Sequence, residues 1–426
     1  VQAAWGGDGP PLMVGEDTLS VFTALWGPPS AGVRPVPPDR LLDSAWDQRP
    51  VWAIIPFESL EPRWKVLAVD GQSPLHKDFD PETYPLVVPF GLYGDAGLVK
   101  AVTVLFGPES GSPMLPASNR DPDKLTTVAM TGVTALVRAT AWTMERRGVT
   151  YPAQDIGDWL RGADITHISN EVPFARDCPY PDPVQEGVVF CSDARYIELL
   201  EAVGTDVVEL TGDHFHDWGP EAMLYTLELY DERGWPYYGG GANYEDGRGA
   251  ALLEHNGNRF AFIGCNGKGG SFAQASATRP GAVACDFDWL HAETARLTRE
   301  GYLVIATFQH FEYYSYTAPP NMQADFRGMA EAGAVIVSGS QAHHPHALEF
   351  WDGALLHFGL GNLFFDQYGL SPGTDEGFID RHVFYDGRHI STELLAIVFV
   401  DYARPRPMTA GERAALLRVV FAAGGW

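Results

Sequence analysis

No stretch of this sequence is apolar for long enough to cross a bilayer. The longest apolar runs, LLAIVFV and GYLVIATF, have the length of strands, whereas a membrane helix needs about 20 residues. We therefore expect no membrane span. The chain begins at Val1 without the charged and apolar regions of a signal peptide. We expect any such peptide to have been removed or to lie outside this sequence.

Basic residues are also scarce. The chain has 29 Lys and Arg against 55 Asp and Glu, which gives a formal net charge of −26. This charge would repel the phosphates of nucleic acids and the surface of anionic membranes, so we expect no nucleic-acid partner. The same acidity suits a secreted protein, and we expect the chain to lie outside the cell or at its surface.

The chain has only four cysteines, and none of them belongs to the C-x-x-C pair of a zinc ribbon or redox motif. Metal binding through thiolates is therefore not expected. Proximity in sequence favours disulfides between Cys178 and Cys191 and between Cys265 and Cys285, each closing a short loop. Buried free thiols are the alternative.

With 426 residues, the chain is too long for one ordinary core. Residues 1–106 combine the strand-like runs VWAIIPF, WKVLAVDG and YPLVVPFGLYG with two helical segments, which predicts a small α/β domain. Residues 107–124 are rich in Gly, Pro, Ser and Asn and lack apolar periodicity, as is typical of a linker.

Residues 125–400 alternate helices that end in glycine with apolar strands, the pattern of βαβ units. Three Asn-Gly or Asp-Gly turns between apolar runs predict hairpins. Together they predict an α/β fold in which two sheets are sandwiched between outer helices. Residues 401–426 should form a C-terminal helix that begins with a capping box of Thr409 and Glu412.

Polar side chains follow four of the predicted strands, where ligands bind in α/β sheets. They are Asn170 and Glu171 after ADITHIS; Asp213, His214, His216 and Asp217 after DVVEL; Gln309, His310 and Glu312 after YLVIATF; and His343, His344 and His346 after AVIVSGS. Each loop alone could be an ordinary polar turn. For Asp217, the alternative to a role in the site is that it merely stabilises the start of the next helix. Their occurrence at one edge predicts a metal or catalytic pocket.

Imidazole, carboxylate and amide groups together suit manganese, zinc or iron rather than calcium. Such an ion could activate water and polarise a phosphoryl group. The sequence contains neither the G-x-x-x-x-G-K-[ST] phosphate loop nor the G-x-G-x-x-G dinucleotide motif, and we interpret GGGAN and GKGGS as turns.

The order of these motifs resembles the CapA family of poly-γ-glutamate capsule-synthesis proteins, whose fold is similar to calcineurin-like metallophosphoesterases. The motifs are TGVTALVR, SNEVPF, TGDHFHDWG, FQHFEYY, GSQAHHPHALEF and GLGNLFFD, within about residues 125–400. The N-terminal region more faintly resembles one lobe of an extracytoplasmic solute-binding protein.

The resemblance implies roles for individual residues. It implicates Glu171, His214, His344 and His346 as metal-site residues, with Asp217 behind His214, Asn362 in the closing loop and a looser match at His310. Two departures stand out: Val133 replaces the acid of the first motif, and Gly212 and Asp213 precede His214 where the family has two asparagines. We expect either one metal ion, held by Glu171, Asp213, His214, His344 and His346, or no ion in a site kept for its architecture.

Three hypotheses follow. The first is a secreted metal-dependent hydrolase or transferase that acts on a phosphoester or an anionic polymer such as poly-γ-glutamate, with Arg138 or His310 steadying the anion. The second is a catalytically degenerate extracellular protein that keeps the fold and assembles into a homo-oligomer or filament. The third is a solute-binding module in residues 1–106.

Overall fold

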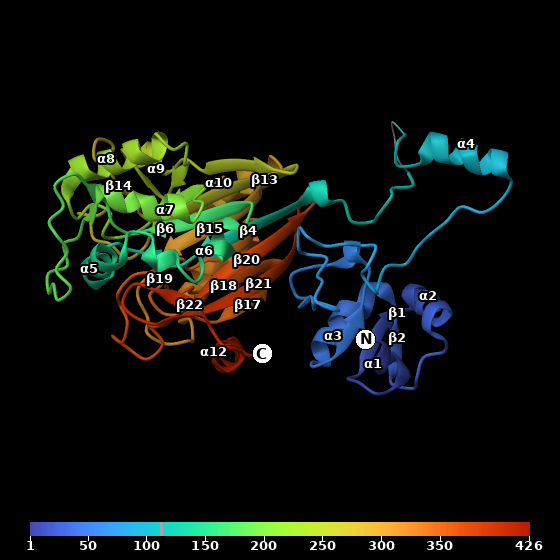
Figure 1. The fold of residues 1–426 in the computed structure, drawn as a ribbon. Coiled ribbons are helices and arrows are strands. Elements are labelled where there is room, and N and C mark those ends of the chain that lie inside the picture. The colour runs from blue at the N-terminus through green and yellow to red at the C-terminus, as the bar shows by residue number, and fades with distance from the viewer. Residues whose placement is uncertain (111–113) are drawn as a thin grey trace. The chain divides into compact units, whose positions relative to one another are not determined.

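The computed structural model describes residues 1–110 and 114–426, so residues 111–113 of the expected linker lie outside the described part. The chain divides into two compact units, Val1–Leu125 and Thr126–Trp426 (Figure 1). Among the described residues, no helix combines the length and apolar character that a membrane crossing requires.

The first unit is built on a three-stranded parallel sheet of order β2-β1-β3. Alternate residues of the central strand point to opposite faces: Leu12 and Val14 pack in one apolar cluster and Met13 in another. The elements are α1 (Gln2–Gly6), β1 (Leu12–Gly15), α2 (Glu16–Trp26), β2 (Val33–Val36), α3 (Leu41–Asp47), β3 (Trp52–Ile54) and α4 (Ala96–Phe106).

The prediction of two further strands in this unit is wrong. The run WKVLAVDG contains no strand beyond a single bridge between Val69 and Gln72, and YPLVVPFGLYG lies in irregular structure. Pro85 and Pro89 cannot donate to a strand ladder, which explains why the second run does not join the sheet. Apolar composition alone does not identify a strand when the segment has no neighbour to pair with.

The second unit contains two large sheets, as expected (Figure 1). The first has the order β10-β9-β6-β4-β20-β21-β22, with β5 paired to β6 and β19. Its strands are β4 (Leu125–Thr131), β5 (Val133–Thr134), β6 (Ile165–Asn170), β9 (Val207–Glu209), β10 (Tyr237–Tyr238), β19 (Asn362–Phe364), β20 (Glu376–Tyr385), β21 (Arg388–Phe399) and β22 (Pro405–Pro407).

The second sheet has the order β12-β13-β15-β16-β18-β17. Its strands are β12 (Ala251–His255), β13 (Asn258–Asn266), β15 (Leu303–Gln309), β16 (Ala334–Ser338), β17 (Leu348–Trp351) and β18 (Ala354–His357). Two small pairs complete the strands: β7 (Phe174–Ala175) with β8 (Ser192–Asp193), and β11 (Gly240–Gly241) with β14 (Gly281–Ala282).

Three apolar cores separate the layers of the second unit. Strand alternation sends Val128 and Ile305 into the core between the sheets, Ala129 towards the helices on the first sheet, and Val304 towards those on the second. The helices are α5 (Arg138–Arg147), α6 (Gly157–Arg161), α7 (Ile197–Ala202), α8 (Gly219–Asp231), α9 (Tyr244–Gly247), α10 (Phe287–Arg299), α11 (Pro320–Glu331) and α12 (Ala410–Ala423). The two-sheet α/β sandwich expected from the sequence is therefore confirmed.

The three predicted hairpins are confirmed as β12–β13, β17–β18 and β20–β21. Each turn pairs an Asn or Asp with a Gly, and both residues have positive φ, for example 49° at Asn256 and 73° at Gly257. Such turns match the twist of the flanking strands, which is why these dipeptides predict hairpins. The capping box of Thr409 and Glu412 also begins α12 as expected.

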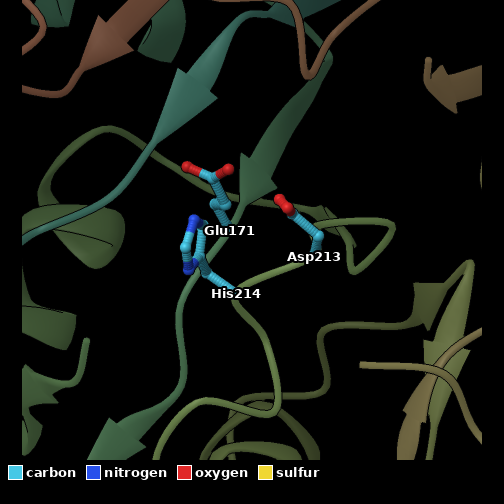
Figure 2. Close-up of side chains that lie close together, drawn as sticks. All are labelled: Glu171, Asp213 and His214. Carbon is cyan, nitrogen blue, oxygen red and sulfur yellow. The ribbon is translucent and has the colours of Figure 1, made fainter. Parts of the chain in front are cut away.

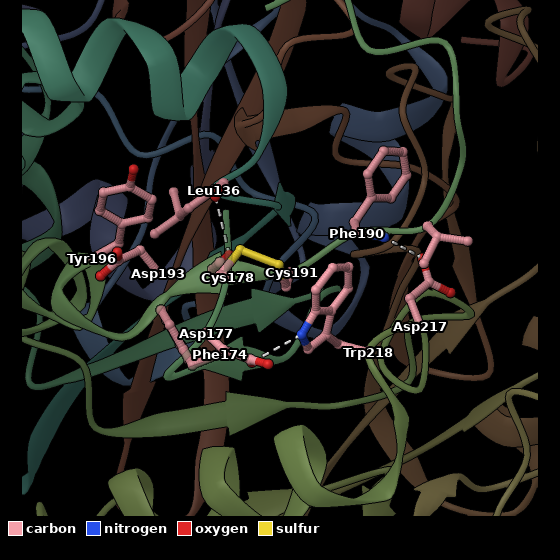
Figure 3. The surroundings of a disulfide bond; sticks show 12 residues. Leu136, Phe174, Asp177, Cys178, Phe190, Cys191, Asp193, Tyr196, Asp217 and Trp218 are labelled. Carbon is pink, nitrogen blue, oxygen red and sulfur yellow. Dashed lines mark hydrogen bonds between the residues drawn. A yellow bond between two sulfur atoms is a disulfide. The ribbon is translucent and has the colours of Figure 1, made fainter. Parts of the chain in front are cut away.

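Both predicted disulfides are present, Cys178–Cys191 and Cys265–Cys285, and the described residues contain no free cysteine. The first closes a loop that ends in Phe190, whose amide donates to Asp217, as Figure 3 shows. The second closes a loop that contains Lys268. Both loops reach the candidate site described below.

Candidate metal centre

The candidate site lies just past the ends of two parallel neighbouring strands. β6 ends at Asn170 and is followed by Glu171, and β9 ends at Glu209, shortly before Asp213 and His214. Figure 2 shows these three side chains together, and one ligand atom of each lies within 4.8 Å of the others. The carboxyl edge of the sheet thus collects two carboxylates and an imidazole.

Glu171 is the unusual member of this group. Its side chain is 1% exposed, and neither carboxylate oxygen has a hydrogen-bond partner among the described residues. Burial raises the pKa of this carboxyl, against the lowering effect of His343 and His214. A buried carboxylate without partners is costly, and a bound cation relieves that cost, so the donor set fits a divalent metal.

Gly212 brings the two loops together. A Cβ at this position would lie 2.8 Å from Glu171 Cα and 2.9 Å from its Cγ, closer than real side chains approach. Glycine therefore permits the segment before Asp213 to pack directly against Glu171. The departure from the family motif at Gly212 has this steric consequence.

His214 is oriented by a carboxylate, as in many metal-binding histidines. Its Nδ1 lies 2.7 Å from Asp217 Oδ2, which also accepts the Phe190 amide at 2.9 Å. This contact holds the ring from the Nδ1 side and leaves Nε2 for a ligand. Burial lowers the pKa of His214, but Asp217, Glu171 and Asp213 outweigh it and raise the pKa to about 9.

Asp213 is held by two neighbours. Its Oδ1 accepts a hydrogen bond from Gln309 Nε2 at 2.7 Å, and its Oδ2 lies 3.0 Å from Lys268 Nζ. Burial would raise the pKa of the carboxyl, but the Lys268 charge and the other contacts lower it. Asp213 is therefore ionised in the folded protein.

A second carboxylate, Glu312, shares the Lys268 ammonium and also faces His343. His343 Nε2 lies 3.4 Å from Glu312 Oε1 and 3.8 Å from Glu171 Oε1, while its Nδ1 contacts Asn362 Oδ1 at 2.8 Å. Burial lowers the pKa of His343, and the two carboxylates raise it further than burial lowers it. Asn362, at the start of β19 and not in a loop as expected, thus orients a histidine of the site.

The other expected histidines make different contacts. His344 is bonded through Nδ1 to the Pro345 carbonyl and through Nε2 to the Pro372 carbonyl. His346 contacts the Ser315 carbonyl through Nδ1, and burial lowers its pKa to about 3. Within the described chain, the metal-compatible group of Glu171, Asp213 and His214 includes neither ring, and His343 is the imidazole placed beside Glu171.

His310 and Arg138, expected to steady an anion, lie on two separate cavities. His310 Nε2 contacts Asp325 Oδ2 at 2.9 Å beside a cavity of about 290 Å³. Arg138, at the start of α5 with φ of 43°, pairs with Asp366 and lines another cavity of about 300 Å³.

Two aromatic rings connect Arg138 to the site. Its guanidinium lies 5.2 Å from the ring centre of Phe190 and 5.0 Å from that of Phe365. Phe190 in turn packs against His214 and Phe365 against His343, with ring centres 4.9 Å and 5.2 Å apart. The Arg138 cavity is therefore one aromatic ring away from the candidate ligands.

Lys268 was not expected at the site. The motif GKGGS was interpreted as a turn, and no spacing rule connects it to Asp213. The clue in the sequence is Cys265 three residues earlier, because a disulfide to Cys285 closes the loop and restricts where Lys268 can lie. Val133, by contrast, is fully buried in β5, next to Ser169 of β6, and offers no ligand.

Comparison with known proteins identifies the family. Residues 127–367 match the family described as bacterial capsule synthesis protein PGA_cap, which is more than half of the chain. The chain belongs to this family. The resemblance seen in the motifs is thereby confirmed.

Curated members of the family show the same relationship. The chain is 25% identical over 305 residues to the capsule biosynthesis protein CapA of Bacillus anthracis, covering 69% of this chain and 72% of that protein. It is 22% identical over 247 residues to the PGA biosynthesis protein CapA of Bacillus subtilis, covering 57% of this chain and 64% of that protein.

Solved structures with some similarity include two nucleotidases. One is a 5′-nucleotidase precursor from Thermus thermophilus, with a TM-score of 0.39, 14% identity, and coverage of 69% of this chain and 58% of that one. The other is the NAD nucleotidase of Haemophilus influenzae, with a TM-score of 0.38, 9% identity, and coverage of 69% and 62%.

Proposed function

We propose that this PGA_cap family member binds one divalent transition metal ion, manganese, zinc or iron, and uses it to cleave or transfer an anionic substrate. The observation that carries the proposal is the buried Glu171 carboxylate, which has no hydrogen-bond partner in the described structure and is grouped with Asp213 and His214. The substrate class we favour is an anionic polymer such as poly-γ-glutamate, because the chain belongs to a family of capsule synthesis proteins. A phosphoester is the alternative.

Glu171, Asp213 and His214 would hold the ion, with His343 the next imidazole. A divalent ion at this place supplies Lewis-acid polarisation of an acyl or phosphoryl oxygen and activates water. Asp217 fixes the orientation of His214. His343, held by Asn362 between Glu171 and Glu312, is placed to accept or donate a proton.

The Arg138 cavity is the proposed place for an anionic group of the substrate. Its lining includes Arg138, the Asp366 carboxylate with which Arg138 pairs, and the polar side chains Gln185, Gln367 and Tyr402. Phe190 and Phe365 lie between this cavity and the candidate ligands, and such rings exclude water and strengthen electrostatic contacts. His310, paired with Asp325 beside the other cavity, has no role in this proposal.

The proposal is tested by metal analysis followed by an activity assay. Protein purified without chelators should contain the ion, and added manganese should raise Tm by mass action. The metal-loaded protein is then incubated with poly-γ-glutamate and with p-nitrophenyl phosphate, with Glu171→Gln as the inactive control. Absence of turnover on both substrates by metal-loaded protein would remove the enzymatic part of the proposal.

A second candidate is supported by Val133. The family's first-motif acid is absent, so the fold could serve as a non-catalytic extracellular protein that forms a homo-oligomer or filament. Sedimentation velocity of the full chain distinguishes this alternative, because it requires assembly beyond a monomer whether or not metal is present.

We further propose that the protein acts outside the cytoplasm. Support comes from the two disulfides, since such bonds persist in oxidising compartments. Fractionation of the native host with an antibody to this chain tests it, and a signal confined to the cytoplasmic fraction would contradict it.

A further inference from the structure

Lys268 lies inside the candidate centre, between two carboxylates. Its Nζ lies 3.0 Å from Asp213 Oδ2 and also contacts Glu312 Oε1. Three-quarters of the side chain is buried, since it is 24% exposed. The ammonium therefore bridges two carboxylates that belong to different strand-end loops and offsets one of their two negative charges.

A disulfide and backbone hydrogen bonds fix the loop that carries Lys268. The Cys265–Cys285 disulfide closes the loop, and the neighbouring amides are fixed: Gly267 N donates to the Gln309 carbonyl at 2.8 Å and Gly269 N to Asn266 Oδ1 at 2.5 Å. A Cβ at Gly269 would lie 3.0 Å from Asp213 Cβ, so glycine permits the loop to approach Asp213. A surface lysine would need none of this support.

The three carboxylates of the centre are not equivalent as metal ligands. Asp213 and Glu312 both contact Lys268, whereas Glu171 accepts no hydrogen bond among the described residues and faces His343 Nε2 only at 3.8 Å. Val133 contributes no additional carboxylate. A second divalent ion, which in two-metal sites lies about 3.5–4 Å from the first, would need Glu312 and the Asp213 Oδ2 atom as ligands, and both of these face the Lys268 ammonium.

We propose that Lys268 is a permanent cation that occupies the space between Asp213 and Glu312, where a second divalent ion would otherwise bind, so that the centre holds a single divalent ion at Glu171, Asp213 and His214. This inference rests on the proposed metal function and specifies its stoichiometry. An ammonium neutralises carboxylates but accepts no lone pair, so it cannot activate water as a metal ion does.

The test is metal stoichiometry in the full chain. We would load metal-free wild type, Lys268→Met, Lys268→Arg and the control Lys100→Met with Mn²⁺, count bound ions by equilibrium dialysis and elemental analysis, and record electron paramagnetic resonance spectra. Lys100 lies on the exposed helix α4 and controls for the loss of one positive charge. Near-ultraviolet circular dichroism verifies folding.

We expect about one Mn²⁺ with an uncoupled signal in wild type, Lys268→Arg and Lys100→Met, and about two with an exchange-coupled signal in Lys268→Met. About two ions in wild type would overturn the inference, a result that does not depend on the variant folding. Folded Lys268→Met that still binds about one ion, with Kd within about twofold of wild type, would also overturn it. Wild type without any bound metal would instead refute the proposed function itself.

Discussion

At the scale of single residues, the proposed metal site depends on one carboxylate, Glu171, and on the side chains around it. Replacing Glu171 by Gln keeps the size of the side chain and removes its charge. We expect Mn²⁺ affinity to fall by about 100-fold or more, since even partners that only orient ligands cost about 10–100-fold. Because a buried carboxylate without hydrogen bonds destabilises the metal-free protein, Tm without metal should not fall.

The matched control for this prediction is Glu254→Gln, on the exposed face of β12. Isothermal titration calorimetry with Mn²⁺ measures the affinities. Equal Kd values for wild type and Glu171→Gln would exclude Glu171 as a ligand.

Protons should compete with the metal at His214. In the metal-free protein its pKa is raised to about 9, so at neutral pH most molecules carry a proton on the ring. We expect the apparent metal affinity to rise with pH, up to about tenfold per unit, and to level off above pH 9. The stability of the metal-free protein should change with pH in the opposite direction. The contacts of the protonated ring contribute fully to stability below pH 6.5, and this contribution is lost as pH rises through about 9.

The variant Asp217→Asn tests both effects of Asp217 on His214: the raised pKa of the ring and the orientation of the ring towards the metal. It removes the charge that raises the pKa of His214 and keeps a side chain of similar size. The pH at which metal affinity levels off should move down, and affinity at high pH should fall by about 10–100-fold. Titration calorimetry between pH 6 and 9.5 measures both. An unchanged pH profile would show that Asp217 does not act on His214.

The sequence predicts which residues lie in the strand-end loops, but it does not predict the direction in which their side chains point. The strand-end rule selected Glu171, Asp213 and His214, which the structure places together. In the sequence HHPH, nothing indicates which ring turns towards Glu171, and the structure places His343 there. The position of Lys268 could not be predicted from the local sequence, because it depends on a loop that a disulfide closes.

At the scale of elements, the two disulfide loops serve different ligands. The Cys178–Cys191 loop ends in Phe190 beside His214, and the Cys265–Cys285 loop brings Lys268 to Asp213. Removing either bond, as Cys178→Ser/Cys191→Ser or Cys265→Ser/Cys285→Ser, should lower the free energy of unfolding by about 3 kcal/mol. Chemical denaturation measures this loss as a change in the free energy of unfolding of the second unit.

The two double variants also differ in a predicted second effect. Only Cys265→Ser/Cys285→Ser should loosen Lys268 and so allow additional Mn²⁺ to bind, while Cys178→Ser/Cys191→Ser should weaken the first ion through His214. Identical metal binding in both variants would contradict the separate roles of the loops.

Elements whose formation is governed locally were predicted well from the sequence. The hairpins followed from dipeptides that adopt positive φ, and the capping box of α12 from the side chains of Thr409 and Glu412. The strands expected in WKVLAVDG and YPLVVPFGLYG failed because a strand needs a partner, and the sheet of the first unit uses β1, β2 and β3 instead.

At the scale of the whole molecule, the two units have separate cores. The second unit contains the three clusters that separate its layers and all candidate ligands, and the first has its own small sheet. We expect residues 119–426, which retain all of β4, to fold alone and to bind Mn²⁺ with the affinity of the full chain. Circular dichroism and titration calorimetry check this, and a truncated protein that folds but binds no metal would show that the first unit contributes to the centre.

The central claim is that this family member is a metalloprotein with one ion beside Glu171. The most direct test is elemental analysis of native protein purified without chelators, with Glu171→Gln purified in parallel. The account predicts about one equivalent of manganese, zinc or iron in wild type and a strong loss in the variant. Less than about a tenth of an equivalent in wild type, with no rise in Tm on adding manganese or zinc, would contradict it.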